Sequence, residues 1–357
     1  MSAPTPTFVN KLYSAPPALA FISIGLVQGI IVTILQGIVV IKWQAFLKPT
    51  IMQVPAGYTV PTNFAVFLFG FLFQLAFMCD AIRLRSTAQA MLACVLNAGF
   101  LPLAVLQRHD IKHAEEQLRG STDMNGDHLV YLDRHPWDEY GDILLALPII
   151  VAICTLLLVI SVWYLKKFFS WQSYRNVGAD AKLRRMRIIY QIFVMLAKMV
   201  MYFIICFEVV YGVTQLQGRG TEFIIRMILL GVAVVNICMS IVWCKSENRI
   251  GMIISICIYV AGMAYLVYML VSILIRWRYY STTFETLTSY ASMAIGFILI
   301  TTVFAILCLR NFWSGLKEHL GKHEEAWDQN ARSKDLELET KDGFQYESLG
   351  SKLDLDG

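Results

Sequence analysis

Long apolar stretches alternate with shorter polar segments along most of this chain. A helix needs about 20 mostly apolar residues to cross the hydrocarbon core of a bilayer, and each stretch reaches or approaches that length. The pattern therefore predicts eight membrane-spanning helices, over residues 18–41, 63–79, 86–106, 143–165, 188–211, 223–244, 250–275 and 287–309.

The predicted fold is all-α, a polytopic transmembrane helical bundle. A short N-terminal segment over 1–17 precedes a transmembrane domain over 18–313, and an acidic tail follows over 314–357. From Arg310 to the end, 7 Lys/Arg and 11 Asp/Glu occur among few aliphatic residues, which is typical of disorder. A seven-span alternative, in which one weak stretch is re-entrant, stays open.

The composition excludes a soluble protein. The 357 residues are 57% hydrophobic and 16% charged, and the mean hydropathy is +0.57. Soluble domains carry about 45–50% apolar and about 25% charged residues, so this chain has too little charge to cover a soluble surface. Its expected partner is the lipid bilayer. Nucleic acid is not expected, because the cations lie between apolar stretches and not on a folded basic face.

Cations are concentrated in one segment, 166–187, which holds seven Lys/Arg and one acid. Such segments stay in the cytoplasm, and an even number of spans then places both termini there. The Arg175–Arg187 cluster adjoins the membrane surface, so anionic lipid headgroups are candidate partners beside a purely topogenic role. The long connection 107–142 lies on the opposite side, and it is too short and too charged to bury a core of its own.

Ionisable residues inside the spans are costly and mark candidate sites. Glu208 and Arg226 lie at similar depth in consecutive antiparallel spans, and we expect an ion pair between them near the non-cytoplasmic boundary. Lys198 lies near the middle of its span, and it either snorkels or meets a buried amide such as Asn97, Gln74 or Asn236. Lys198, Glu208, Arg226 and Asn97 are therefore the candidate binding residues. For the amides, which also include Gln28 and Gln36, hydrogen bonding between packed helices is the alternative.

Reaction chemistry has no recognisable pattern here. The sequence holds no phosphate-binding loop, nucleophile elbow, kinase motif set or dinucleotide fingerprint, so no catalytic residue and no cofactor are predicted. His109 and His113 have the i, i+4 spacing of a helical metal site. A third ligand cannot be assigned, so no metal site is predicted and the histidines are interpreted as part of a solvated segment.

Three segments resemble one known family. They are Phe64–Gln107, which contains FLFGF followed by DAIR; Trp171–Phe193, which contains GADAKLRRM and YQIF; and Arg310–Lys317, RNFWSGLK. In this order they are similar to a fungal family of multi-pass membrane proteins of the Golgi apparatus whose function is uncharacterised. The resemblance implies a Golgi membrane address and implies no reaction.

The expected function is therefore that of a non-catalytic Golgi membrane protein in membrane trafficking or organisation. In the tail, Tyr346 and Leu349 fit a tyrosine-x-x-aliphatic sorting signal, which coat adaptors bind in extended form. The alternative is a transporter of a small solute or ion that uses Lys198 and the Glu208/Arg226 pair.

Overall fold

The computed structural model describes residues 16–48, 55–84, 86–122, 127–131, 136–174, 181–215, 220–277 and 283–312. The predicted tail with its sorting signal, Tyr346 and Leu349, lies outside these residues. The side chains of the Arg175–Arg187 cluster lie outside them too, so lipid headgroup binding there stays a prediction.

The predicted all-α transmembrane bundle is confirmed. Within the described ranges the chain forms helices and no β-strand, and eight helices are long and apolar enough to cross a membrane. The helices are α2 (Pro16–Phe46), α3 (Thr59–Arg83), α4 (Thr87–Arg119), α5 (Pro136–Tyr174), α6 (Ala181–Gln215), α7 (Gly220–Lys245), α8 (Arg249–Ile275) and α9 (Phe284–Asn311), with a short 3-10 helix η2 (Pro55–Tyr58) before α3.

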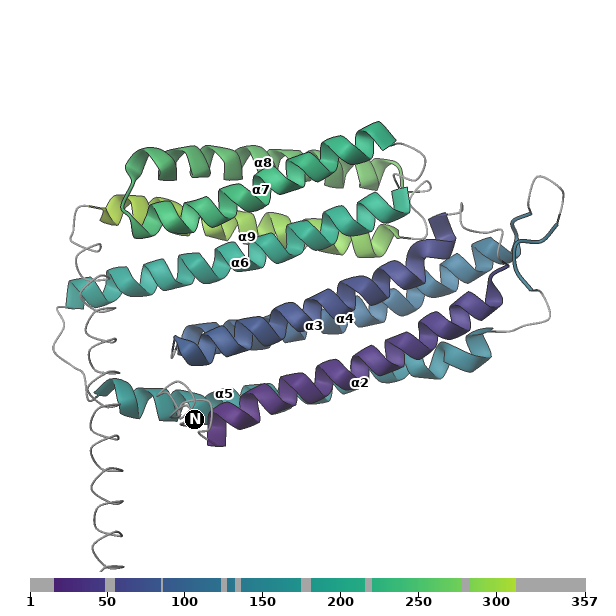
Figure 1. Ribbon diagram of the computed structural model, residues 1–357, viewed down its shortest axis with the longest axis horizontal. Coiled ribbons are helices and arrows are strands. Elements are labelled where there is room, and N and C mark those ends of the chain that lie inside the picture. Colours follow the sequence, from purple (N-terminus) through teal and green to yellow (C-terminus); the bar gives the residue numbers. More distant parts are fainter. Residues whose placement is uncertain are drawn as a thin grey trace, which may run out of the picture.

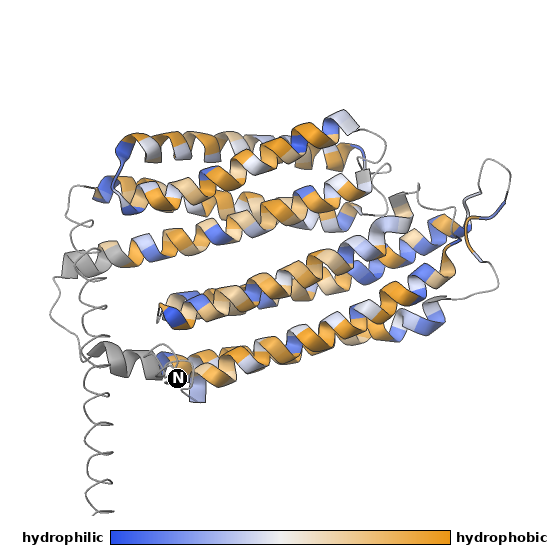
Figure 2. Cartoon of the chain, viewed as in Figure 1, coloured by the Kyte–Doolittle hydropathy of each residue, from blue (hydrophilic) through white to orange (hydrophobic). Residues whose placement is uncertain are grey.

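The helices form two halves that lie side by side. Helices α2 to α5 pack together as the N-terminal half, and α6 to α9 pack together as the C-terminal half (Figure 1). The halves meet along a seam where α3 contacts α6 and α4 contacts α9. Apolar residues cover the middle of the helices and polar ones collect toward their ends, as a bilayer requires (Figure 2).

The seam is closely packed at its centre. Phe73 of α3 stacks on Tyr202 of α6 with ring centroids 4.9 Å apart. A Cβ atom on Gly70 would lie 2.7 Å from the Tyr202 hydroxyl and 2.8 Å from the Phe100 ring, so only glycine fits at this position. The two halves are therefore joined by tight aromatic packing in the middle of the membrane.

Helix α4 corrects the predicted extent of the long connection. The expected loop 107–142 is helical up to Arg119, and α5 already begins at Pro136. Buried Ile111, Ala114 and Leu118 follow each other at helical spacing, which is the apolar stripe that holds this part of α4 against the bundle. The charged residues around this stripe lower the mean hydropathy of the segment, so a hydropathy window does not detect it.

Candidate functional site

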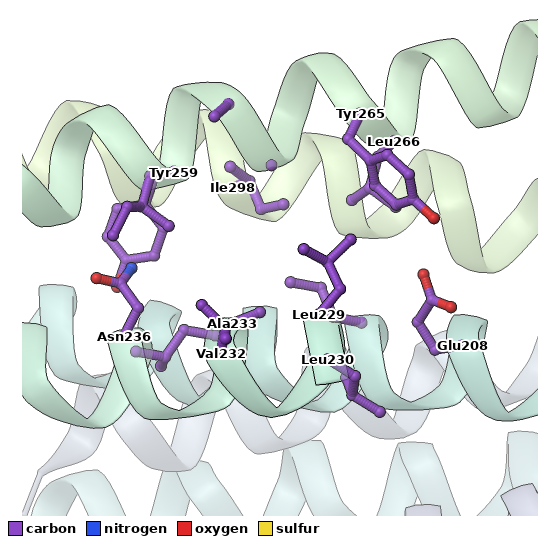
Figure 3. Close-up of a pocket in the computed structure, with 15 residues that line it drawn as sticks. Glu208, Leu229, Leu230, Val232, Ala233, Asn236, Tyr259, Tyr265, Leu266 and Ile298 are labelled. Atoms are coloured by element: carbon purple, nitrogen blue, oxygen red, sulfur yellow. The ribbon is translucent and has the colours of Figure 1, made fainter. Parts of the chain in front are cut away.

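A cavity lies within the C-terminal half, between α7, α8 and the two helices behind them, α6 and α9. Its volume is about 290 Å³, close to the lower end of ligand-binding pockets, roughly 300–1,000 Å³. Most of the lining is aliphatic. The lining residues are Ile204, Glu208, Leu229, Leu230, Val232, Ala233, Asn236, Ile237, Ile258, Tyr259, Ala261, Gly262, Tyr265, Leu266 and Ile298 (Figure 3).

This α7–α8 pocket reaches the outer surface of the bundle. Leu229 and Val232 of α7 and Ile258 of α8 line it, and their side chains are 46%, 53% and 36% exposed. On α8 the lining includes Gly262, where a Cβ atom would meet nothing within 4 Å. In a membrane, exposed apolar residues at mid-helix face lipid, so the pocket opens sideways toward the acyl chains.

An ion pair borders one end of the pocket. Glu208 Oε2 lies 3.7 Å from Arg226 Nη1; the Glu208 side chain is buried and that of Arg226 is part-buried. Arg226 also donates a 2.6 Å hydrogen bond to the Tyr265 hydroxyl and lies over the Tyr211 ring, 4.2 Å from its centroid. The ion pair expected from the sequence is therefore present. Within the described part of the chain, Glu208 Oε2 is buried and has no hydrogen bond, so it can accept one from a ligand.

An amide borders the other end. Asn236 is 6% exposed, and among the described residues its Oδ1 atom has no hydrogen-bond partner. Next to it, the Tyr259 hydroxyl is already engaged with Ser240 at 2.6 Å. Figure 3 shows Asn236 and Tyr259 at one end of the pocket and Glu208 and Tyr265 at the other.

The geometry suits a long, amphipathic ligand. Ten residues separate Arg226 from Asn236, which is about 15 Å along α7. Asn236 Oδ1, and Glu208 Oε2 beside its ion pair with Arg226, can accept hydrogen bonds from a ligand, and the aliphatic wall between them calls for an apolar body. The sequence indicated the charged end through Glu208 and Arg226, and it gave no sign of the pocket. Its aliphatic lining has the composition of any lipid-facing surface.

Lys198 has a partner that the sequence reasoning missed. Its ammonium group forms a short ion pair with Asp80 of α3, and the two side chains are 29% and 28% exposed. The partner of Lys198 is thus a carboxylate and not one of the expected amides. Asp80 also accepts a 2.8 Å hydrogen bond from Gln89 Nε2. Asp80 lies inside α3, which continues to Arg83, whereas hydropathy ended the span at Cys79. The pair bridges the seam between the halves.

Asn97 is hydrogen-bonded to residues of two neighbouring helices. It accepts a 2.8 Å hydrogen bond from Gln28 Nε2 and donates one of 2.8 Å to Thr155 Oγ1. Its side chain is fully buried, and the α7–α8 pocket lies in the other half. Asn97 does not line this pocket, and a binding role for it stays a prediction.

His109 and His113 lie close together. His109 Nε2 lies 3.2 Å from His113 Nε2 on α4, and His109 Nδ1 lies 2.9 Å from Glu285 of α9. Over the described ranges, no three His, Cys, Asp or Glu side chains are grouped to hold a metal ion.

Comparison with curated proteins tests the family resemblance. Over 277 residues the chain is 22% identical to a protein of Schizosaccharomyces pombe (strain 972) named UPF0658 Golgi apparatus membrane protein. The match covers 73% of this chain and 78% of that protein. The predicted resemblance is confirmed.

That S. pombe Golgi membrane protein comes from a fungal family without a characterised function. No family model matches the chain, and no solved structure does. The similarity to the S. pombe protein therefore supports a location in the Golgi membrane, and a molecular role has to be inferred from the pocket and the ion pairs.

Proposed function

We propose that this chain is a non-catalytic, multi-pass protein of the Golgi membrane that acts in membrane organisation by binding a neutral lipid. The address is supported by the Golgi membrane protein of S. pombe to which the chain is similar. The lipid is supported by the α7–α8 pocket, which is the observation on which the proposal depends.

The pocket selects for a neutral lipid with a hydroxyl or amide N–H donor. Arg226 is already neutralised by Glu208, so an anionic headgroup would meet the Glu208 carboxylate without a free cation. A hydroxyl can donate instead to Glu208 Oε2 or to Asn236 Oδ1, two buried acceptors of pocket-lining residues that have no hydrogen bond in the described region. The acyl or ring system then lies along the aliphatic wall and enters from the bilayer between α7 and α8.

Two glycines offer a matched test. Gly262 lines the pocket, whereas Gly231 of α7 does not, and a Cβ atom on either one would meet nothing within 4 Å. Gly262→Leu fills the pocket, while Gly231→Leu adds the same side chain outside it. Overpacking costs about 1–3 kcal/mol, and about 1.4 kcal/mol is tenfold in affinity, so we expect bound lipid to fall about tenfold in Gly262→Leu.

The measurement is mass spectrometry of lipids that remain on the purified full-length protein. Wild type and Gly231→Leu should retain one neutral lipid class in near-stoichiometric amount. Equal retention by Gly262→Leu would contradict the proposal.

A transporter is the second candidate, and one observation favours it. The Lys198–Asp80 pair lies at the seam, where relative movement of the two halves would open a path, and both side chains are part-exposed. Solute uptake into proteoliposomes that Lys198→Leu abolishes, with lipid retention unchanged, would favour this candidate over lipid binding.

A further inference from the structure

The part of α4 beyond the predicted span carries two histidines with converging rings. His109 and His113 are one helical turn apart, and their rings meet almost at right angles, with centroids 4.4 Å apart. Their side chains are 52% and 49% exposed, so water and ions reach them. They lie at the predicted non-cytoplasmic end, away from the α7–α8 pocket and from the Lys198–Asp80 pair.

A carboxylate holds the outer nitrogen of one ring and a second lies near that of the other. Glu285 Oε1 is 2.9 Å from His109 Nδ1, a hydrogen-bond distance, whereas Glu116 Oε2 is 4.0 Å from His113 Nδ1, which is too long for one. At His109, the carboxylate on Nδ1 favours the tautomer in which Nδ1 bears the proton, which leaves the Nε2 lone pair free. Histidines that bind metals are commonly ordered in this way, by a carboxylate on the nitrogen that does not bind the metal.

The inner nitrogens have the spacing of a metal site. Zinc–nitrogen bonds are about 2.0–2.1 Å, and a tetrahedral angle between them places the two nitrogens about 3.3 Å apart. His109 Nε2 and His113 Nε2 are 3.2 Å apart. A hydrogen bond between the rings accounts for the same distance if either histidine carries its proton on Nε2 and donates it to the other.

We propose that His109 and His113 bind one divalent transition-metal ion of the zinc class, with Glu285 of α9 orienting His109 from across the seam. Two protein ligands leave the remaining positions to water, consistent with the lack of a three-residue group in the described chain. Imidazole nitrogen suits zinc, copper and nickel and does not suit magnesium or calcium. Because His109 and Glu285 belong to different halves, bound metal would stabilise the contact between α4 and α9.

Zinc titration of the purified full-length protein, carrying no polyhistidine tag, tests the site. We expect one Zn²⁺ per chain by calorimetry, undiminished by excess Mg²⁺, and a higher melting temperature with zinc. His109→Ala and His113→Ala should each abolish the binding. His128→Ala is the matched control, because His128 is an exposed histidine in the same connection outside the pair, and it should bind as wild type does.

The variant Glu285→Gln distinguishes a metal site from two histidines that are only neighbours. Loss of an orienting partner weakens metal affinity by about 10–100-fold, and we expect a decrease of this size. Saturable binding that survives in the His109→Ala, His113→Ala double variant, or no saturable binding by wild type, would overturn the proposal.

Discussion

Two buried amide sites, one in each half of the molecule, have opposite surroundings. In the N-terminal half, Gln36 and Gln107 exchange two hydrogen bonds of 2.7 and 2.8 Å between α2 and α4. Other buried amide oxygens of this half, Gln28 Oε1 and Gln74 Oε1, have no partner among the described residues. In the C-terminal half, Asn236 Oδ1 is left without a hydrogen bond among the described residues, and a cavity lies beside it. An amide that meets another amide is a packing device, whereas an open acceptor beside a cavity is a place for a ligand.

Breaking the buried ion pair of the C-terminal half should have the largest effect. Arg226→Leu leaves the Glu208 carboxylate buried without its cation, which typically costs about 3–5 kcal/mol. We expect a large fall in melting temperature and in the yield of folded protein. Glu208→Gln in the same chain should restore much of the stability, because the uncompensated charge is gone.

Arg276→Leu serves as the control, since Arg276 is exposed at the same end of the bundle. A fall as large in Arg276→Leu as in Arg226→Leu would show that loss of any arginine at this end is enough. The ion pair would then carry no special weight.

An intermediate effect is expected when one member of the closed amide pair is removed. Gln107→Leu leaves the buried Gln36 amide unsatisfied, which costs about 1–3 kcal/mol. Gln36→Leu combined with Gln107→Leu should recover most of the loss, because no polar group is then left alone. Thermal unfolding of the three variants measures this, and a double variant less stable than either single one would contradict the closed-pair interpretation.

The smallest effect on stability is expected at the open amide. Asn236→Leu removes an acceptor that already lacks a partner, so the free energy of unfolding should change by less than about 1 kcal/mol. The retained lipid should nevertheless decrease. Lipid mass spectrometry and thermal unfolding on one preparation give both numbers, and a strongly destabilised Asn236→Leu would place this residue with the packing amides.

The Glu208–Arg226 pair could be predicted because the two consecutive helices are joined by a short segment. Residues at similar distances from that segment lie at similar depth in the membrane, so counting residues from it was enough. The Lys198–Asp80 pair could not be predicted in this way, because α3 and α6 are not consecutive and their contact depends on how the halves meet. Hydropathy also placed Asp80 outside its span, since a carboxylate at a helix end resembles a boundary.

The eight helices followed from length and hydropathy alone, but the pocket did not. The pocket exists because of the distance between α7 and α8, and no single aliphatic residue of these helices predicts that distance. Gly262 illustrates the difficulty: in sequence it is one more glycine in an apolar helix, and only packing makes it the wall of a cavity.

A high-resolution structure of the full-length protein in lipid nanodiscs tests the central claim most directly. We predict elongated density between α7 and α8, with a polar end within hydrogen-bond distance of Glu208 or Asn236. An α7–α8 pocket closed by side chains would contradict the account, and so would a water-filled path that reaches Lys198 at the seam.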